Sequence, residues 1–597
     1  MPVLTIVDTT GIQNYIFRSN RLRENIGASE IVAQATSDWV CEVLQDPQLG
    51  WATNLKPAGI ALRNIFDQID EGKELENHGL AAELIYAGGG NTLVLFDSPN
   101  HAKEFEYWYS RILLKRAPGL DVVVGHSGEF NMAALDEVNR PMIERASNQA
   151  GDQIDDLKAN RPISAPVMGL GVTVECASTG GVAVDRPQTE SDRKKYSANA
   201  YLSAETLAKL AHTRQANERL QRELLNDELR TLWSQLPVKA DQEFNPFEKT
   251  AAGFRFTLNV PLDFDDLGRT SGDTSYIAVV HTDGNGVGER VRKFGQAAAT
   301  SREWIKRARK FSRSIYRANL AALQQTIALL LSRIAKQKND YMLLGTHGQE
   351  FTLSKYEDIS CLPFRPLIFG GEDVAFVCDG RVGIALAAYY LKQAELQTLA
   401  DEKPLFTRAG ISIVKSHYPF SRSYKLAEDL AKSAKERIVK VDPRKTLCAI
   451  DWHIAATGLA GDVNEIRRRE YTIRGENYLN IRPLTLHRAS DTDGWRSWDV
   501  FARMIEHFLK PEWCERRNKI KALQSALREG NEATRDFITL YRLKGLPPVE
   551  GIAPETDGWH GSHCSYFDAI EAIDIFFPLE TFTAGTRAQA VQSQEAQ

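Results

Sequence analysis

Two neighbouring carboxylates stand at the tip of an expected β-hairpin. The tetrapeptide Gly370-Gly371-Glu372-Asp373 joins two apolar runs, 366–369 and 374–377, whose pattern predicts buried strands. The glycines allow the positive φ of a tight turn and let a polyphosphate approach the backbone closely. Two acids held this close repel each other unless a cation neutralises them. The motif therefore indicates Mg²⁺ and a nucleotide, and a solvated acidic turn is the alternative.

A third carboxylate, Asp283, follows the apolar strand 276–282 and precedes a glycine-rich bend at 284–288. An acid at the end of a central strand can reach a neighbouring hairpin tip, and the helix behind it offers free N–H groups to phosphate. Asp283, Glu372 and Asp373 would then supply oxygen ligands to hard divalent ions. This arrangement is used for two-metal phosphoryl or nucleotidyl transfer.

The elements around these acids follow the order βαββαβ. A helix over 298–337 separates Asp283 from the hairpin, and a helix over 382–399, a strand over 407–414 and a helix over 424–435 follow the hairpin. This is the order of the ferredoxin-like split βαβ fold, the palm of many polymerases and nucleotide cyclases. Because a fold does not give a function, the acids carry the functional prediction.

The same order of elements is predicted once more near the start of the chain. Its strands are expected at 3–8, 84–87, 92–96 and 121–125, and its helices at 13–36 and 101–115. The turn keeps its glycines, but Gly90 and Asn91 stand where the other copy has Glu372 and Asp373, and only Asp8 remains of the acids. Such a palm can bind a nucleotide through its backbone, so we predict a non-catalytic partner.

The predicted fold class is α+β, with two ferredoxin-like palm domains, a linker region and a C-terminal helical domain. The expected boundaries are 1–150 for the first palm, 151–267 for the linker with a charged helix at 205–235, 268–455 for the second palm, 456–578 for the helical domain and 579–597 for a disordered tail.

Several sequence blocks carry a family resemblance when taken together. The blocks are 11–17, 22–29 and 87–91 in the first palm, and 283–288, 370–373, 415–420 and 433–435 in the second. Together they resemble the Cas10 family, the large subunit of type III CRISPR effector complexes, also called Csm1 or Cmr2. The bend at 283–288 is similar to the family's DGDNMG-like strand end, with Asn285 in place of its second acid. The turn resembles the family's GGDD turn, with Glu372 in place of one Asp.

The resemblance implies a nucleotidyl cyclase that condenses ATP into cyclic oligoadenylates, the second messengers of an antiviral defence. It implies that Asp283 and Asp373 bind two Mg²⁺ or Mn²⁺ ions directly, and that Glu372 is a further ligand or a base. Phosphate contacts are implied for the backbone at Gly284, Gly288, Gly370 and Gly371 and for the side chains of Lys415 and Lys435; a solvated charge is the alternative for each lysine. RNA or other effector subunits are the expected partners, in an oligomer or a multi-subunit complex.

Two departures from the family bear on the function. The sequence shows no His-Asp dipeptide of an HD nuclease, and Cys176 is the single cysteine between the palms, too few for a zinc ribbon. We therefore expect a compact Cas10 or a stand-alone cyclase. One alternative function is a non-catalytic scaffold that binds nucleotide or RNA, which the Glu372 turn favours. Another is a diguanylate-cyclase-like or polymerase activity, which the unequal palms oppose.

The sequence does not decide the roles of three further groups of charged or metal-ligating residues. A basic helical stretch can hold triphosphates or an RNA backbone, or form a solvated face; its cations are Arg290, Arg292, Lys293, Arg302, Lys306, Arg307, Arg309, Lys310, Arg313 and Arg317. The cluster His560, His563, Cys564 and Asp568 is metal-like, but a structural turn is favoured. The run 467–469 of arginines is a partner contact or a solvated run.

Composition limits the partners and the compartment. The net charge of −5 gives no global attraction to nucleic acid. The seven cysteines include no CxxC pair, which fits a reducing cytoplasm. The sequence has no apolar stretch of about eighteen residues and no signal peptide, so neither membrane insertion nor secretion is expected.

Overall fold

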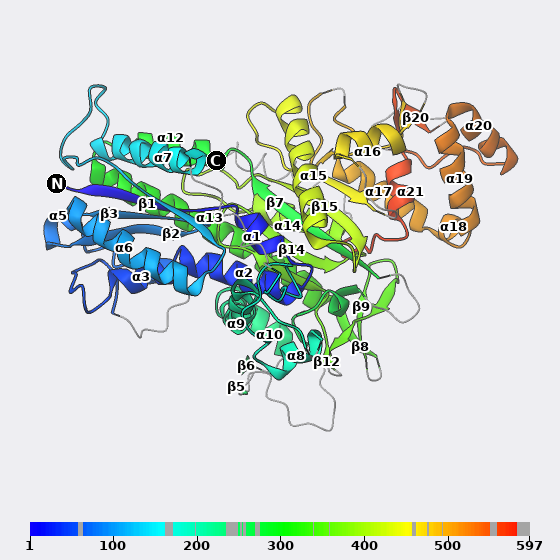
Figure 1. The fold of residues 1–597 in the computed structure, drawn as a ribbon. Helices are drawn as coiled ribbons and strands as arrows, with labels where there is room; N and C mark the ends of the chain where they lie inside the picture. Colours follow the sequence, from blue (N-terminus) through cyan, green and yellow to red (C-terminus); the bar gives the residue numbers. More distant parts are fainter. Residues whose placement is uncertain are drawn as a thin grey trace.

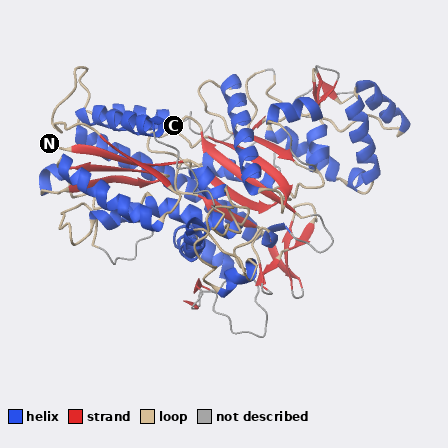
Figure 2. Ribbon diagram, in the orientation of Figure 1, coloured by secondary structure: helices blue, strands red, loops and turns tan. Residues whose placement is uncertain are grey.

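The computed structural model has a mixed α+β fold in which two large sheets are surrounded by helices (Figure 1). Figure 2 shows the two sheets lying apart, with helices on both sides of each. The structure describes residues 1–57, 64–160, 171–197, 199–234, 249–250, 253–254, 258–268, 275–337, 340–356, 359–455, 461–473, 477–491, 493–549 and 558–581.

The first sheet is four-stranded with the order β2-β3-β1-β4, and all its neighbouring strands are antiparallel. Its strands are β1 (Val3–Thr10), β2 (Ala82–Gly88), β3 (Asn91–Phe96) and β4 (Asp121–His126). The helices before β2 are α1 (Ile12–Phe17), α2 (Leu22–Ala35), α3 (Asp38–Leu44), α4 (Ile65–Gln68) and α5 (Leu75–His78). The single helix expected at 13–36 is therefore divided between α1 and α2.

The two faces of the first sheet pack against different helices because side chains alternate along each strand. Val3 and Val7 share one core with α2 and with α6 (Pro99–Arg116). Leu4 on the opposite face shares another core with α7 (Met142–Asn160) and with the long helix α13 (Ser301–Ser332). Figure 1 shows α6 and α7 on opposite sides of this sheet. Helix α13 thereby joins the first sheet to the second.

The second sheet is six-stranded with the order β13-β14-β7-β15-β16-β19. Its strands are β7 (Tyr276–Gly284), β13 (Phe364–Ile368), β14 (Val374–Asp379), β15 (Thr407–Lys415), β16 (Ala449–Ile454) and β19 (Leu484–Thr485). The first four positions repeat the order of the first sheet, with the earliest strand of each group in the third position. Strand β7 pairs antiparallel with β14 on one side and with β15 on the other.

One face of the second sheet is covered by α15 (Phe420–Val441). The helix turns an apolar stripe to the sheet at helical spacing, which includes Tyr424, Ala427 and Ala434. Gly410 of β15 permits the close approach, since a Cβ there would lie 2.0 Å from the carbonyl oxygen of Ala427. A second stripe of α15 carries lysines and faces the site described below.

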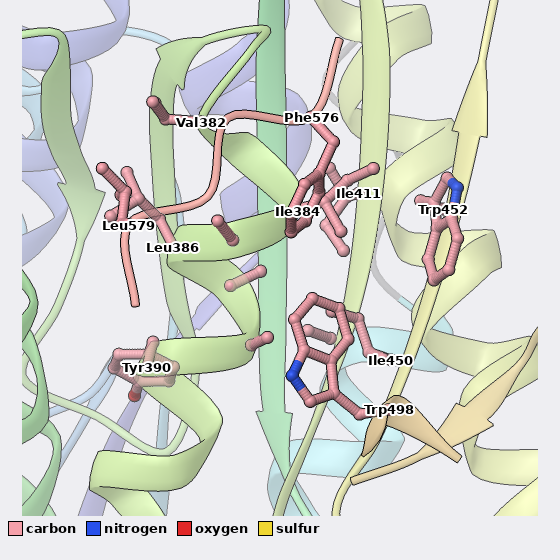
Figure 3. Packing of buried hydrophobic residues seen from close by; sticks show 14 of the residues in the cluster. Val382, Ile384, Leu386, Tyr390, Ile411, Ile450, Trp452, Trp498, Phe576 and Leu579 are labelled. Atoms are coloured by element: carbon pink, nitrogen blue, oxygen red, sulfur yellow. The ribbon is translucent and has the colours of Figure 1, made fainter. Parts of the chain in front are cut away.

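The opposite face of the sheet packs against α13, α14 (Gly383–Glu395) and the C-terminal part of the chain. Figure 3 shows this core, where side chains of α14 meet β15, β16, α17 and the segment after α21. The labelled residues are Val382, Ile384, Leu386, Tyr390, Ile411, Ile450, Trp452, Trp498, Phe576 and Leu579. Leu579 is buried, so the ordered chain extends past the expected boundary at 578. The rest of the expected tail, from 582 on, lies outside the described residues.

Helices dominate after β16. They are α16 (Val463–Glu470), α17 (Trp498–Leu509), α18 (Pro511–Cys514), α19 (Arg517–Glu529), α20 (Asn531–Leu540) and α21 (Phe567–Ala572). A small sheet joins them, formed by β17 (Thr472–Ile473), β18 (Asn477–Tyr478), β21 (His563–Cys564) and β20 (Trp559–His560). In the part of the chain that the structure describes, no helix is long and apolar enough to cross a membrane.

The linker region is docked on the first sheet's helices. Helix α9 (Ala204–Arg219) crosses α2 so closely that a Cβ on Gly27 would lie 1.7 Å from the carbonyl oxygen of Lys209. Lys209 is 2% exposed, and its ammonium donates to the Tyr15 carbonyl and to Glu205. The charged helix expected at 205–235 is broken into α9, a π-helical turn (Leu220–Leu224) and α10 (Asp227–Ser234).

The helix expected over 298–337 ends early. Helix α13 stops at Ser332, and β8 (Ile334–Gln337) follows it and pairs with β9 (Asp340–Leu344). Ile334 pairs with Leu343, and both are buried in the main core. Pairing with the next strand in a hairpin, together with burial in the core, therefore overrides the helical pattern at this point. Further short elements here are β10 (Glu350–Thr352), β11 (Lys355–Tyr356), β12 (Ile359–Ser360) and, in the linker, β5 (Lys249–Thr250), β6 (Gly253–Phe254), α8 (Glu190–Lys195) and α11 (Asp265–Gly268).

Candidate metal and nucleotide site

The carboxylates singled out in the sequence meet where β7 ends beside the hairpin β13–β14. Thr282 pairs with Val374, which places Asp283 and Asp373 next to each other across the two strands. Oxygens of these two acids and a ring nitrogen of His281 all lie within 4.8 Å of one another. Glu372 is adjacent, because a Cβ built on Gly284 would lie 3.8 Å from the Glu372 Cβ.

Burial raises the pKa of all three acids. Burial raises the pKa of Asp373 to about 8, and the nearby Asp283 and Glu372 add to that shift. Burial also raises the pKa of Asp283, against the opposing effect of Arg408 and Lys435. Desolvation, followed by the charge of Asp283, raises the pKa of Glu372. The negative charge is thus incompletely compensated, and a divalent cation bound by these oxygens would relieve it.

Arg408, which the sequence analysis missed, is the main counter-ion of Asp283. It is the direct cross-strand partner of Asp283 on β15, and its guanidinium donates to the Asp283 carboxylate. It also donates to the Asn285 side chain at 3.0 Å and to the Gly284 carbonyl at 3.2 Å. Asn285 in turn donates to the Leu447 carbonyl. The presence of a charged residue inside the otherwise apolar run 407–414 was the feature of the sequence that could have identified Arg408 as part of the site.

His281 was missed as well. It precedes Asp283 by two residues, so both side chains project from the same face of β7. Its Nδ1 lies 3.0 Å from the Tyr424 hydroxyl, and Tyr424 stacks on Phe17 of α1 at a centroid distance of 3.8 Å. Burial, with Arg408 and Lys425 nearby, lowers the pKa of His281 to about 4, so the ring is neutral. The i, i+2 spacing from Asp283 was the signal in the sequence.

A cavity of about 710 Å³, lined by both basic and acidic side chains, opens on one side of the acids. His281, Asp283, Asp373 and Arg408 form its floor, and α15 forms its wall. The cations on that wall are Lys425, Lys432, Lys435 and Lys440. Lys435 therefore lies beside the acids, and its contact with a triphosphate stays a prediction. The same wall also carries Glu428, Asp429 and Glu436, and Lys425 pairs with the first two. Lys435, whose charge acts on Asp283, is therefore the cation best placed for a phosphate.

Lys415 does not belong to this site, which corrects the sequence-based prediction. β15 runs antiparallel to β7, so Lys415 pairs with Tyr276 at the start of β7, whereas Arg408 pairs with Asp283 near its end. At about 3.3 Å per residue, Lys415 is roughly 20 Å along the strand from Arg408. The charge of Lys415 therefore lies at the opposite end of the strands from Asp283.

A second cavity of about 570 Å³ lies on the other side of the acids, between the turns of the two sheets. It is lined by 88–90 of the first turn and 370–373 of the second. Further lining comes from α1 to α4 and from Arg219, Arg222 and Tyr316. Asp373 and Gln13 line both cavities, so the acids stand at their junction.

The two glycine turns touch through their backbones. A Cβ on Gly371 would lie 2.7 Å from the Gly89 Cα, and Gly370 has a φ of +107°. The Asn319 side chain of α13 donates to the Gly371 carbonyl and so holds this turn against α13. Glycine is thus required here by contact and by backbone conformation.

Replacing Gly371 by Val is expected to destabilise the protein, because its Cβ meets rigid backbone. Overpacking of this kind costs about 1–3 kcal/mol, measurable as a lower urea midpoint. Gly288→Ala in α12 (Val287–Gln296) is the matched control, since a Cβ there meets nothing within 4 Å and alanine favours a helix by about 1 kcal/mol. Equal stability of Gly371→Val and the parent chain would show that the turns can separate.

The first sheet's acid is already neutralised. The Lys158 ammonium lies 2.6 Å from the Asp8 carboxylate, and Asp8 pairs with Asn91 across β1 and β3. Asn91 occupies the place beside Asp8 that Asp373 occupies beside Asp283. The single cluster of potential metal ligands within the described part of the chain is His281, Asp283 and Asp373.

The basic stretch of α13 is largely used in holding the two sheets together. Arg302 and Arg309 pair with the buried Glu83, while Lys306 pairs with Glu74 and Arg313 with Glu71. These acids all belong to the segment around β2 of the first sheet. The helix is thus neither a triphosphate site along its whole length nor simply a solvated face.

The other two groups have structural roles. Asp568 accepts hydrogen bonds from the backbone of Ile481 and Arg482, and His563 stacks on Tyr478, so both residues make the structural contacts that a turn before a helix requires. Arg467 pairs with the buried Asp451 at 2.5 Å and holds α16 against β16. Neither group faces the acids described above.

Comparison with known proteins finds similarity at the level of structure. No protein-family description matches the sequence, and no curated protein matches it. Across 96% of its length the chain resembles Csm1 in a Csm1–Csm4 cassette complexed with AMPPNP, covering 69% of that chain at 14% identity and a TM-score of 0.48. It also resembles Csm1 from T. onnurineus, over 96% of this chain and 69% of that one, at 13% identity and a TM-score of 0.43.

Proposed function

We propose that the chain is a metal-dependent nucleotidyltransferase of the Cas10 type, which joins ATP into cyclic oligoadenylates in CRISPR-type antiviral defence. The observation that carries the proposal is the convergence of Asp283 and Asp373 at the junction of two cavities, one lined by the lysines of α15 and one bordered by glycine turns. In this proposal both sheets are ferredoxin-like palms, and the first is the non-catalytic partner.

The donor set fits hard divalent ions. Carboxylates that are close together and have raised pKa values are ready to exchange a proton for a cation. Asp283 and Asp373 would hold two Mg²⁺ or Mn²⁺ ions, with Glu372 beside them, and the ions when bound would activate a ribose 3′-hydroxyl and neutralise the leaving pyrophosphate. Arg408 would have to release Asp283, and its guanidinium would then be free to contact a phosphate.

The remaining residues would bind and orient the two nucleotides. The lysines of α15 would hold one triphosphate by charge-assisted hydrogen bonds. The backbones of Gly370 and Gly371, facing Gly89 and Gly90, would let the second nucleotide approach the acids closely. The Gly286 bend, with a φ of +67°, starts α12 and aims its free N–H groups toward the same edge of the sheet.

Lys435→Gln is expected to weaken ATP binding. A hydrogen bond to a charged group contributes about 1.5–3 kcal/mol, so KM for ATP should rise by about tenfold or more while the fold is kept. Lys415→Gln removes the same charge at the far end of β15 and is the matched control. Equal effects of the two substitutions in steady-state assays would exclude a specific role for Lys435.

Pyrophosphate release tests the proposed activity. The purified chain is incubated with ATP and Mg²⁺ or Mn²⁺, with and without RNA, and the product is identified by mass spectrometry. Cyclic oligoadenylates are expected. Separate incubation with each of the four nucleoside triphosphates distinguishes this activity from that of a diguanylate cyclase or a polymerase.

A non-catalytic scaffold is the second candidate function. The observation in its favour is that Arg408 already neutralises Asp283 and is held there by Asn285, which stands where the family has its second acid. Such a subunit would bind ATP and assemble with RNA or other effector subunits. Tight ATP binding without pyrophosphate release, under every metal and RNA condition, would support it over the enzyme.

A further inference from the structure

His281 lies inside the acid cluster and not merely near it. The side chain is 6% exposed and lines the cavity beside α15 with Asp283 and Asp373. Its ring nitrogen lies within 4.8 Å of an oxygen of each acid. Ligands of one ion at bond lengths of about 2.1 Å are at most roughly 4 Å apart. A shift of less than about 1 Å, together with release of the Asp283 carboxylate by Arg408, therefore completes a three-ligand site.

The ring is held in one orientation. Nδ1 is bonded to the Tyr424 hydroxyl at 3.0 Å, which leaves Nε2 as the nitrogen for a cation. Tyr424 is itself fixed, since it is 3% exposed and stacks on Phe17 from the first sheet's α1. A hydrogen bond of this kind to the outer ring nitrogen is what positions histidine ligands in metal sites.

We propose that His281 Nε2 is a nitrogen ligand of the cation bound by Asp283 and Asp373, and that the site thereby selects Mn²⁺ and other first-row transition ions over Mg²⁺. This inference rests on the proposed metal site. Mg²⁺ prefers oxygen ligands and gives up its waters reluctantly, whereas imidazole suits transition ions. With two carboxylates alone the site would suit Mg²⁺; the added nitrogen shifts its preference.

Calorimetric titration of the full chain with Mn²⁺ and with Mg²⁺ tests the selectivity. The parent chain should bind Mn²⁺ more tightly than Mg²⁺ by about tenfold or more, and His281→Gln should lose most of that difference. Tyr424→Phe keeps the ring stack but removes the bond to Nδ1, so it should cause a smaller loss of Mn²⁺ affinity. His417→Gln is the control for loss of an imidazole, because His417 is exposed and follows the far end of β15.

Pulsed electron paramagnetic resonance of bound Mn²⁺ supplies a direct signature. Nitrogen modulation of the spin echo is expected for the parent chain and for His417→Gln, and it should be absent from His281→Gln. Mn²⁺ that binds to the parent chain without nitrogen modulation would overturn the assignment. So would an equal loss of Mg²⁺ and Mn²⁺ affinity in His281→Gln.

The two proposals fail in distinguishable ways. Mn²⁺ binding that Asp373→Asn removes and His281→Gln leaves intact would refute only the role of His281. Absence of Mn²⁺ and Mg²⁺ binding by the parent chain, with ATP present, would refute the metal site and the proposed function together. Circular dichroism of each variant shows whether a loss comes from misfolding.

Discussion

Asp373→Asn is expected to abolish nucleotidyl transfer and to make the metal-free protein more stable. Losing a direct metal ligand withdraws several kcal/mol of transition-state stabilisation, which corresponds to a fall in kcat of about a thousandfold or more. Pyrophosphate release under saturating ATP and Mn²⁺ measures it. The amide keeps the size and the polar character of the side chain, so the fold should be kept.

The stability gain follows from the raised pKa of Asp373, about 8 in the folded protein. The folded state holds this proton more tightly than the unfolded chain does, so ionisation destabilises the fold as the pH rises from the ordinary aspartate value toward 8. The melting temperature of Asp373→Asn should therefore exceed that of the parent chain most clearly above pH 8, and the difference should vanish in acid. A melting temperature of Asp373→Asn below that of the parent chain at pH 9 would contradict the proposal that the ionised Asp373 destabilises the fold.

Asp8→Asn is the matched control in the first sheet. Asp8 holds the equivalent strand position but pairs with Lys158, and Asn91 stands beside it. Activity should persist in this variant. Loss of activity in Asp8→Asn comparable with that in Asp373→Asn would contradict the division into a catalytic and a non-catalytic palm.

Metal affinity is expected to rise steeply with pH up to about 8 and then to level off. Because Asp373 is protonated at neutral pH in the absence of metal, an ion must displace a proton to bind. Release of one proton changes the apparent Kd by about tenfold per pH unit well below the pKa, so Mn²⁺ should bind about fiftyfold more tightly at pH 8 than at pH 6. Calorimetry in buffers of different ionisation enthalpy counts the protons released.

The same titration of Asp373→Asn supplies the control. This variant should bind the ion weakly and show a much flatter pH dependence, since the displaced proton is gone. A flat profile for the parent chain, or an unchanged slope in the variant, would show that Asp373 does not exchange a proton for the metal.

The meeting of the acids was predictable from the sequence. An acid after a buried strand and two acids in the turn before another apolar strand fall at the same end of a sheet when the two strands are antiparallel neighbours. Strands β7 and β14 are such neighbours, and the glycines allow the turn to reach its position. The apolar pattern also placed β1 to β4 of the first sheet near their observed bounds.

Lys415 was misplaced because strand direction was not considered. β15 is antiparallel to β7, so its last residue, Lys415, lies beside the start of β7, away from Asp283. The same register explains why Arg408, at the start of β15, is the residue that meets Asp283. Direction, more than distance along the chain, decides which end of a strand contributes to a site.

Long-range pairing was not visible in local patterns. In the sequence, the cations of α13 are typical of a solvated or nucleic-acid-binding face. In the structure, Arg302 and Arg309 form ion pairs with Glu83 of a strand that is distant in the chain. The contact of Gly371 with Gly89 likewise depends on how the two sheets pack. Such contacts arise only after the sheets are assembled.

Crystals of the protein soaked with Mn²⁺ and a non-hydrolysable ATP analogue would test the central claim most directly. Anomalous diffraction at the manganese edge is expected to show metal between the carboxylates of Asp283 and Asp373, with Arg408 displaced from Asp283. Bound nucleotide without anomalous density there, and with the pair of Arg408 and Asp283 intact, would contradict the account.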